Sequence, residues 1–220
     1  MIGAGTMEDL RYDSGIWVFI DLGFAQKKAS CGLLEGEGKP EEFAFNEVGR
    51  KLSELATGTG NDGLTLNLVI EAPLSVAFTR DGNPTGRKFE KRQSETRYWY
   101  VGLGCSVLVA ATYIMRQLVE AKPRKEIRLF EGFASFKPKG QRSSHMGDVC
   151  RLRQVVREYP DCKTGVIIAP DDLRSLADDR IESAFAVANM SLGVPPVVVI
   201  NAYDSPHVHD FTGGVEDASV

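Results

Sequence analysis

The chain has 220 residues, of which 43% are hydrophobic and 25% charged, a composition typical of a globular protein with a sizeable core. Its 26 basic and 30 acidic side chains give a net charge of −4. That balance argues against a globally basic nucleic-acid coat protein, while a local basic patch stays open. The four cysteines, at positions 31, 105, 150 and 162, share no metal-type spacing, so reduced intracellular thiols are expected rather than a disulfide framework.

Three predicted strands open the chain. They follow residues 1–14, a loose lead-in that lacks the basic and then apolar segments of a signal peptide. The strands are predicted at Trp17–Leu22, Ala29–Leu34 and Glu42–Asn46, with Pro40 placing the third near a sheet edge. Because short loops join them, we expect an antiparallel meander.

Helical and strand patterns alternate in the middle of the chain. A helix is predicted at Val48–Thr57 and a strand at Leu64–Ile70. A polar, basic loop follows at Thr79–Thr96, and then a long, mostly apolar helix at Tyr98–Ala121. The most apolar part of that helix, Val101–Ile114, is too short to span a bilayer. We therefore expect no membrane partner and a cytoplasmic location.

The last part of the chain continues this alternation. A strand is predicted at Ile127–Phe130, and Asp148–Tyr159 has the spacing of an amphipathic helix. The stretch Ile181–Leu192 is predicted as a helix of small residues, and Pro195–Ile200 as a final strand. The fold class that follows is a single mixed α/β domain with a central sheet covered by helices.

That domain is expected to span residues 15–203, and residues 204–220 are expected to form a mobile tail. Within the tail, His207 and His209 could ligate one metal ion if the segment is extended, although a polar terminus is more typically disordered. His145 has no sequence-near partner that would make it a catalytic base.

Carboxylates follow three of the predicted strands: Asp21, Glu71 and Glu131. A further group of acids, Asp178, Asp179 and Glu182, opens the predicted small-residue helix, where residues three and four apart share a face. If the strand ends converge, these acids form one negatively charged pocket. Each acid taken alone is equally typical of a solvated turn residue or a helix cap.

Carboxylates gathered in one pocket raise each other's pKa unless a cation or a shared proton relieves the repulsion. Mg²⁺ and Mn²⁺ prefer oxygen ligands and supply that relief. Two such ions can activate a water and stabilise the leaving oxygen in phosphodiester cleavage. The acids therefore indicate a site for one or two Mg²⁺ or Mn²⁺ ions.

Short motifs in the chain resemble the ribonuclease H-like superfamily. The segment "FIDLGFAQKKASCGLL" (Phe19–Leu34) is similar to its first hairpin, with an aspartate on strand one and a glycine turn. More closely, "VIEAPLS" (Val69–Ser75) resembles the "IDAPLG"-like segment of a family of uncharacterised predicted nucleases with this fold. The segments "RLFEGFAS" (Arg128–Ser135) and "DDRIESAFAVA" (Asp178–Ala188) are similar to that family's strand-end acid and late helix. The resemblance covers about Trp17–Ile200.

The resemblance implies a fold and a set of site residues. The fold is a ribonuclease H-like mixed sheet, in which a three-stranded antiparallel meander joins parallel strands flanked by helices. Asp21 matches the strand-one aspartate, Glu71 the strand-four acid, and Asp179 or Glu182 the acid of the late helix. Glu131 completes the predicted metal ligands. The chain departs from the pattern in having Glu71 and Glu182 where aspartate is commoner.

The basic loop is the predicted substrate-binding element. Arg87, Lys88 and Arg92 follow the Glu71 strand closely enough to overhang the acidic pocket, and arginine suits phosphate. A solvated, flexible loop explains the same residues equally well. The aromatics Tyr98–Tyr100 could stack on bases, although aromatics that open an apolar helix more often belong to the core.

Two functions fit these observations. The first is a metal-dependent nuclease or phosphodiesterase acting on DNA, RNA, a branched junction or a nucleotide. The second is a catalytically inactive module of the same fold that binds nucleic acid or protein, which the net charge of −4 and the glutamates favour. The oligomeric state is left open.

Overall fold

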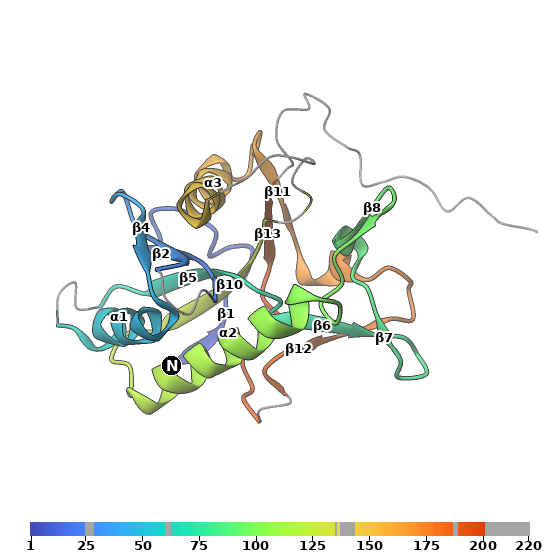
Figure 1. Cartoon of the computed structure of the whole chain (residues 1–220), viewed down its shortest axis with the longest axis horizontal. Helices are drawn as coiled ribbons and strands as arrows, with labels where there is room; N and C mark the ends of the chain where they lie inside the picture. Colours follow the sequence, from blue (N-terminus) through green and yellow to red (C-terminus); the bar gives the residue numbers. More distant parts are fainter. Residues whose placement is uncertain (25–28, 60–62, 135, 137–143, 187–188, 201–220) are drawn as a thin grey trace, which may run out of the picture.

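The computed structural model describes residues 1–24, 29–59, 63–134, 136, 144–186 and 189–200. Within them the main sheet has eight strands in a mixed arrangement (Figure 1). Its antiparallel half is a meander of β2 (Ile16–Asp21), β3 (Cys31–Glu35) and β4 (Glu41–Phe43). The predicted meander is therefore confirmed.

The other half of the sheet is mostly parallel. Strand β5 (Leu66–Glu71) lies parallel to β2, β10 (Ile127–Phe133) lies parallel to β5, and β13 (Val197–Ile200) lies parallel to β10. Strand β11 (Gly165–Ile168) closes this edge in the antiparallel sense. These pairings confirm a mixed α/β sheet flanked by helices.

The N-terminal segment differs from the predicted loose lead-in. Residues Ile2–Ala4 form strand β1, which pairs in parallel with β10. Leu10 is buried and packs in the core with Trp17. The segment therefore belongs to the domain that it precedes, and its three strand residues were too few to show a periodic pattern. The predicted tail, 204–220, lies outside the described residues.

Helices cover both faces of the sheet because each strand alternates its side chains between two apolar cores. On one face α1 (Phe45–Thr57) and α2 (Leu103–Glu120) pack over Val18 and Ile20 of β2. On the other face α3 (His145–Glu158) packs over Trp17 and Phe19 of the same strand. Figure 1 shows α3 above the sheet, with α1 and α2 on the opposite side.

Helix α2 begins later than predicted because Gly102 has φ +59 and interrupts the helical run. Among the described residues, α2 is the one helix long and apolar enough, by length and composition alone, to cross a membrane, and 28% of it is buried. Ile114, Met115 and Leu118 of α2 lie in the core against the sheet. Its buried face is that of an amphipathic core helix.

The predicted small-residue helix at Ile181–Leu192 is wrong over its described beginning. Residues Arg180–Ser183 form strand β12, which pairs antiparallel with β6 (Ser75–Phe78). Along β12, exposed and partly buried residues alternate, which is the period of a strand. That pairing with β6, remote in sequence, decides against the helix.

The predicted basic loop at Thr79–Thr96 contains regular structure. It holds short strands and one 3₁₀ turn: β7 (Pro84–Thr85), η1 (Lys88–Glu90), β8 (Lys91–Arg92) and β9 (Glu95–Thr96). Strand β7 joins β6 and β12 in a small second sheet, and β8 pairs with β9 as a hairpin. A second 3₁₀ turn, η2 (Pro170–Leu173), contacts η1.

Gly32 on β3 allows the start of α3 to approach the meander. A Cβ atom built at Gly32 would lie 2.5 Å from the carbonyl oxygen of His145, whereas one built at Gly3 would meet nothing within 4 Å. We expect Gly32→Ala to lower the free energy of unfolding by about 1–3 kcal/mol, because the helix must shift. Gly3→Ala is the matched control and should change it by less than about 0.5 kcal/mol. Urea denaturation measures both, and equal effects would contradict this packing.

Glu158, the last residue of α3, holds the turn that leads to β11 through hydrogen bonds. Its carboxylate accepts hydrogen bonds from the backbone amides of Lys163 and Thr164, the Thr164 hydroxyl and the Gln154 side chain. Partial desolvation raises the pKa of Glu158, but these hydrogen bonds outweigh it and lower the pKa to about 2.

The stabilisation from Glu158 should depend on pH. Because its pKa is lower in the folded than in the unfolded chain, the contribution is complete above about pH 4.5 and is lost as pH falls toward about 2. We expect Glu158→Gln to flatten the fall in urea midpoint over this interval, relative to the wild type. Parallel pH profiles for the two proteins would contradict the prediction.

Candidate functional site

Two carboxylates end adjacent parallel strands at the same level of the sheet. Asp21 and Glu71 are register partners between β2 and β5, and neighbouring strands lie about 4.8 Å apart. Both residues continue the row of Phe19 and Val69, which faces α3. Asp21 is 3% exposed and Glu71 is half-buried. The structure thus brings together the two acids that the sequence placed at the ends of strands one and four.

The next strand places a glycine beside this pair. Gly132 of β10 is the register partner of Glu71. A Cβ atom built at Gly132 would lie 3.1 Å from a methyl carbon of Leu152 on α3 and 3.3 Å from the Cα of Glu71. Across the sheet, Asp21 and Glu71 therefore lie between two glycines, Gly32 of β3 and Gly132 of β10.

His145, the first residue of α3, contacts this pair through Asp21. Its Nδ1 lies 2.9 Å from Oδ2 of Asp21, and its side chain is 39% exposed. The Ser144 hydroxyl accepts a hydrogen bond from the Gly147 amide at 3.1 Å and so caps the helix at this point. A histidine here can hold the Asp21 carboxylate in place and offset its charge when protonated.

Sequence reasoning missed His145 because its partner is remote in the chain. No local sequence signal pointed to it, and the close fit of His145 to the glycines of the first hairpin is seen only in the folded structure. A Cβ atom at Gly23 would lie 2.9 Å from the His145 imidazole, and one at Gly32 would clash with its backbone. One turn further along α3, the buried carboxylate of Asp148 lies 3.5 Å from a guanidinium nitrogen of Arg151.

Asp21, Glu71 and His145 line one cavity of about 550 Å³. The start of α2 forms another wall, with Leu103 and Val107, and the residues after β9 contribute Arg97 and Tyr98. Arg97 is exposed, and its backbone amide donates to the Glu90 carbonyl at 2.8 Å. The cavity therefore combines the Asp21–Glu71 carboxylate pair, a cationic side chain and apolar walls, and the buried residue Glu90 also belongs to its lining.

Glu131 lies on the other side of the sheet. It is the register partner of Ile70 rather than of Glu71, so it shares the face of Leu129 and Ile127. Its carboxylate accepts hydrogen bonds from the Leu74 and Ser75 amides at 2.9 and 3.1 Å, and from the Ser75 hydroxyl at 3.2 Å. The structure therefore gives Glu131 a structural set of partners behind the sheet, outside the lining of the cavity.

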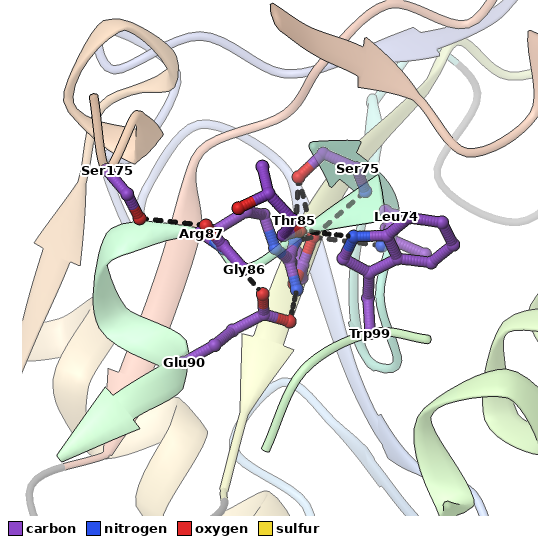
Figure 2. Close-up of polar contacts among 9 residues, drawn as sticks. Leu74, Ser75, Thr85, Gly86, Arg87, Glu90, Trp99 and Ser175 are labelled. Atoms are coloured by element: carbon purple, nitrogen blue, oxygen red, sulfur yellow. Dashed lines mark hydrogen bonds and ion pairs between the residues drawn. The ribbon is translucent and has the colours of Figure 1, made fainter. Parts of the chain in front are cut away.

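Arg87 belongs to the same buried network, which Figure 2 shows with Ser75 and Glu90. Its guanidinium lies 2.7 Å from Glu131 and 2.8 Å from Glu90, and all three side chains are 1% exposed or less. Burial lowers the pKa of Arg87, but the two carboxylates raise it above its ordinary value. Burial also raises the pKa of Glu131, against the opposing effect of Arg87 and the Leu74 amide. Arg87 is thus removed from the solvent that a substrate phosphate would occupy.

The remaining predicted residues lie elsewhere. Asp179 is buried and accepts a hydrogen bond from the Leu176 amide at 2.8 Å, whereas Glu182 is exposed on β12, 3.9 Å from Arg180. The predicted shared helical face of these two acids is wrong because the segment is a strand. Lys88 is exposed on η1 and Arg92 is half-buried on β8. The described lining of the cavity includes neither the two acids nor these two basic residues.

The aromatic residues Tyr98–Tyr100, which follow the β8–β9 hairpin, have different roles. Trp99 donates its indole N–H to the Thr85 carbonyl at 3.0 Å (Figure 2). It also packs edge-on against Phe78, and both contacts stabilise the small second sheet. Tyr98 lines the cavity and stacks on Tyr100 at 5.4 Å between ring centroids. Tyr98 is therefore the aromatic of this group that a bound molecule could contact.

The donor set of the cavity fits one hard cation better than a pair. Mg²⁺ in phosphate-handling sites is commonly held by one or two carboxylates together with waters and substrate oxygens, and Asp21 and Glu71 supply two. Over the parts of the chain that the structure describes, no group of three or more His, Cys, Asp or Glu residues is placed to hold a metal ion. His207 and His209 lie outside those parts.

Comparisons of the chain with protein-family models, curated proteins and solved structures found no match.

Substitutions at Arg87 and at its neighbour Lys88 compare a buried structural arginine with a solvent-exposed lysine. We expect Arg87→Met to lower the free energy of unfolding by about 3–5 kcal/mol, because Glu131 and Glu90 would stay buried without their cation. Lys88→Met, at an exposed position, should change it by about 0.5 kcal/mol or less. Urea denaturation followed by circular dichroism measures both. Similar losses for the two variants would show that the buried network does not stabilise the fold in this way.

Proposed function

We propose that the chain is a metal-dependent phosphodiester hydrolase, with a nuclease as the leading case. The observation that carries the proposal is the register pairing of Asp21 with Glu71 at the ends of two parallel strands, inside a cavity. Two carboxylates at this spacing favour a bound cation over mutual repulsion. The order of the sheet, with a meander followed by parallel strands, is also that expected from the ribonuclease H-like resemblance.

In this proposal Asp21 and Glu71 hold the cation, which is Mg²⁺ or Mn²⁺. When bound, such an ion supplies Lewis-acid activation of water and charge stabilisation at the phosphate. His145 fixes the orientation of the Asp21 carboxylate through Nδ1, as partners of metal-ligating groups commonly do. Glu131, Asp179 and Glu182 are left out of the ligand set, because their side chains lie away from the cavity lining.

The substrate phosphate lies between the acids and the cationic wall. Arg97 is the arginine of the described cavity lining, and its guanidinium suits bidentate contact with phosphate. Tyr98 offers a ring face to a base or sugar. A volume of about 550 Å³ lies within the ordinary range for small-molecule sites, so the cavity suits a single nucleotide unit of DNA, RNA or a free nucleotide. The cytoplasmic location expected from the sequence is kept as part of the proposal.

A binding module without catalytic activity is the second candidate. It is favoured because just two of the five predicted metal ligands reach the cavity. Calorimetry with MgCl₂ and MnCl₂ separates the candidates. An enzyme should bind one of these ions at millimolar concentration or below, whereas a module should bind nucleic acid without it.

Asp21→Asn tests the proposed enzyme directly. With Mn²⁺ present, the wild type should hydrolyse bis(p-nitrophenyl) phosphate or a single-stranded oligonucleotide. Asp21→Asn should lower the rate by more than about 100-fold, beyond the loss usual for residues that merely support metal ligands. The same variant should weaken Mn²⁺ binding in calorimetry.

Asp178→Asn is the matched control, because Asp178 is exposed and outside the described cavity lining. It should leave hydrolysis and Mn²⁺ binding unchanged. Hydrolysis that survives in Asp21→Asn, or that falls equally in Asp178→Asn, would contradict the assignment of the acidic pair.

A further inference from the structure

Helix α2 presents an apolar face that the described residues of this chain leave uncovered. Val109 and Tyr113 of α2 are 66% and 49% exposed, and they share a face because they lie four residues apart. Singly exposed apolar residues are ordinary, but neighbouring ones that form a contiguous patch mark an interaction surface. Figure 1 shows α2 along the outside of the molecule, with α1 beside it.

A shallow apolar groove of about 570 Å³ runs beside this face. Phe24 and Phe45 form one side of it, with ring centroids 5.8 Å apart, and Tyr113 lies 6.1 Å from Phe45 on the other side. Cys105 and Val109 of α2 also line the groove. Val109 and Tyr113 themselves line the groove, so the exposed apolar part of α2 is continuous with it.

The exposed side of α2 carries a stripe with the spacing of a heptad repeat. Steps of four and three residues alternate along it, as at the seam of packed helices. The stripe consists of Gly102, Ser106, Val109, Tyr113, Arg116 and Glu120. Its buried counterparts, Ala111, Ile114 and Leu118, face the core.

We propose that this stripe is the interface of a homodimer, in which α2 packs antiparallel against α2 of a second copy about a two-fold axis midway between Val109 and Tyr113. In that register Val109 of one copy lies opposite Tyr113 of the other, and Ser106 lies opposite Arg116. Gly102 lies opposite Glu120. Each pair joins a short residue to a long one, so the stripe is complementary in shape to itself.

Charge favours a second copy in the same register. The N-terminus of α2 has no acidic residue in its first turn and no side-chain cap, and its C-terminus carries Glu120. Antiparallel packing brings Glu120 of one copy to the helix N-terminus of the other, where a negative charge is stabilising. The contact within each chain between Arg116 and Glu120, at 2.9 Å, is exposed and therefore weak. An isologous two-fold interface needs self-complementarity of this kind.

Light scattering after size exclusion tests the proposal on the full chain. The wild type should have twice the mass of the 24.1 kDa chain at micromolar concentration. Val109→Asp should raise the dimer dissociation constant by about 30-fold or more, because it buries a charge at the centre of the interface. Leu176→Asp, at a position 68% exposed and outside α2, is the matched control and should leave the dimer unchanged. Circular dichroism should show that both variants are folded.

A charge exchange tests the register. Ser106→Arg should weaken the dimer, because the new side chain faces Arg116 of the second copy, and adding Arg116→Glu should restore it. The proposal is overturned if the wild type is a monomer at 100 μM concentration or higher, or if Val109→Asp leaves the dimer intact. It is also overturned if the double variant stays weakened, or if the monomer binds anionic lipid vesicles in a manner that depends on Val109.

Discussion

The buried ion pair between Arg87 and Glu131 joins the small second sheet to the centre of the main sheet. Glu131 belongs to β10, a central strand, whereas Arg87 belongs to the segment that carries the small second sheet. A buried pair of this kind adds little net stability over an apolar substitute, because both charges must leave water. Its effect is on geometry. The Arg87 guanidinium binds Glu131 and Glu90 at the same time, and these contacts hold the segment after β5 against the main sheet.

The position of that segment determines one wall of the cavity. Arg97 bonds through its amide to the carbonyl of Glu90, the other carboxylate partner of Arg87. Arg97 and Tyr98 therefore reach the cavity from a segment that the buried pair holds in place. Arg87 and Arg97 therefore have different surroundings. Arg87 is enclosed behind the sheet with Glu131, and Arg97 stands in the open cavity with Asp21 and Glu71.

Helix α2 contributes residues both to the cavity and to the outer surface of the protein. Its first turn lines the cavity through Leu103 and Val107, and its middle carries the exposed stripe at Val109 and Tyr113. In the proposed dimer, Glu120 of one copy lies near the first turn of the other, next to a cavity wall. Contacts at the dimer interface would therefore bear on the shape of the candidate site.

Local periodicity in the sequence determined the meander, the amphipathic faces of α1 and α3, and the two acids at the ends of β2 and β5. These features depend on residues close together in the chain, where the periods of strand and helix show directly. Tertiary structure alone decided the role of each charged group. Glu131 differs from Glu71 by one position in strand register, which turns it to the opposite face. His145 meets Asp21, and β12 meets β6, across long stretches of chain. Burial and register come from pairing between remote segments, and a linear pattern of residues does not contain that pairing.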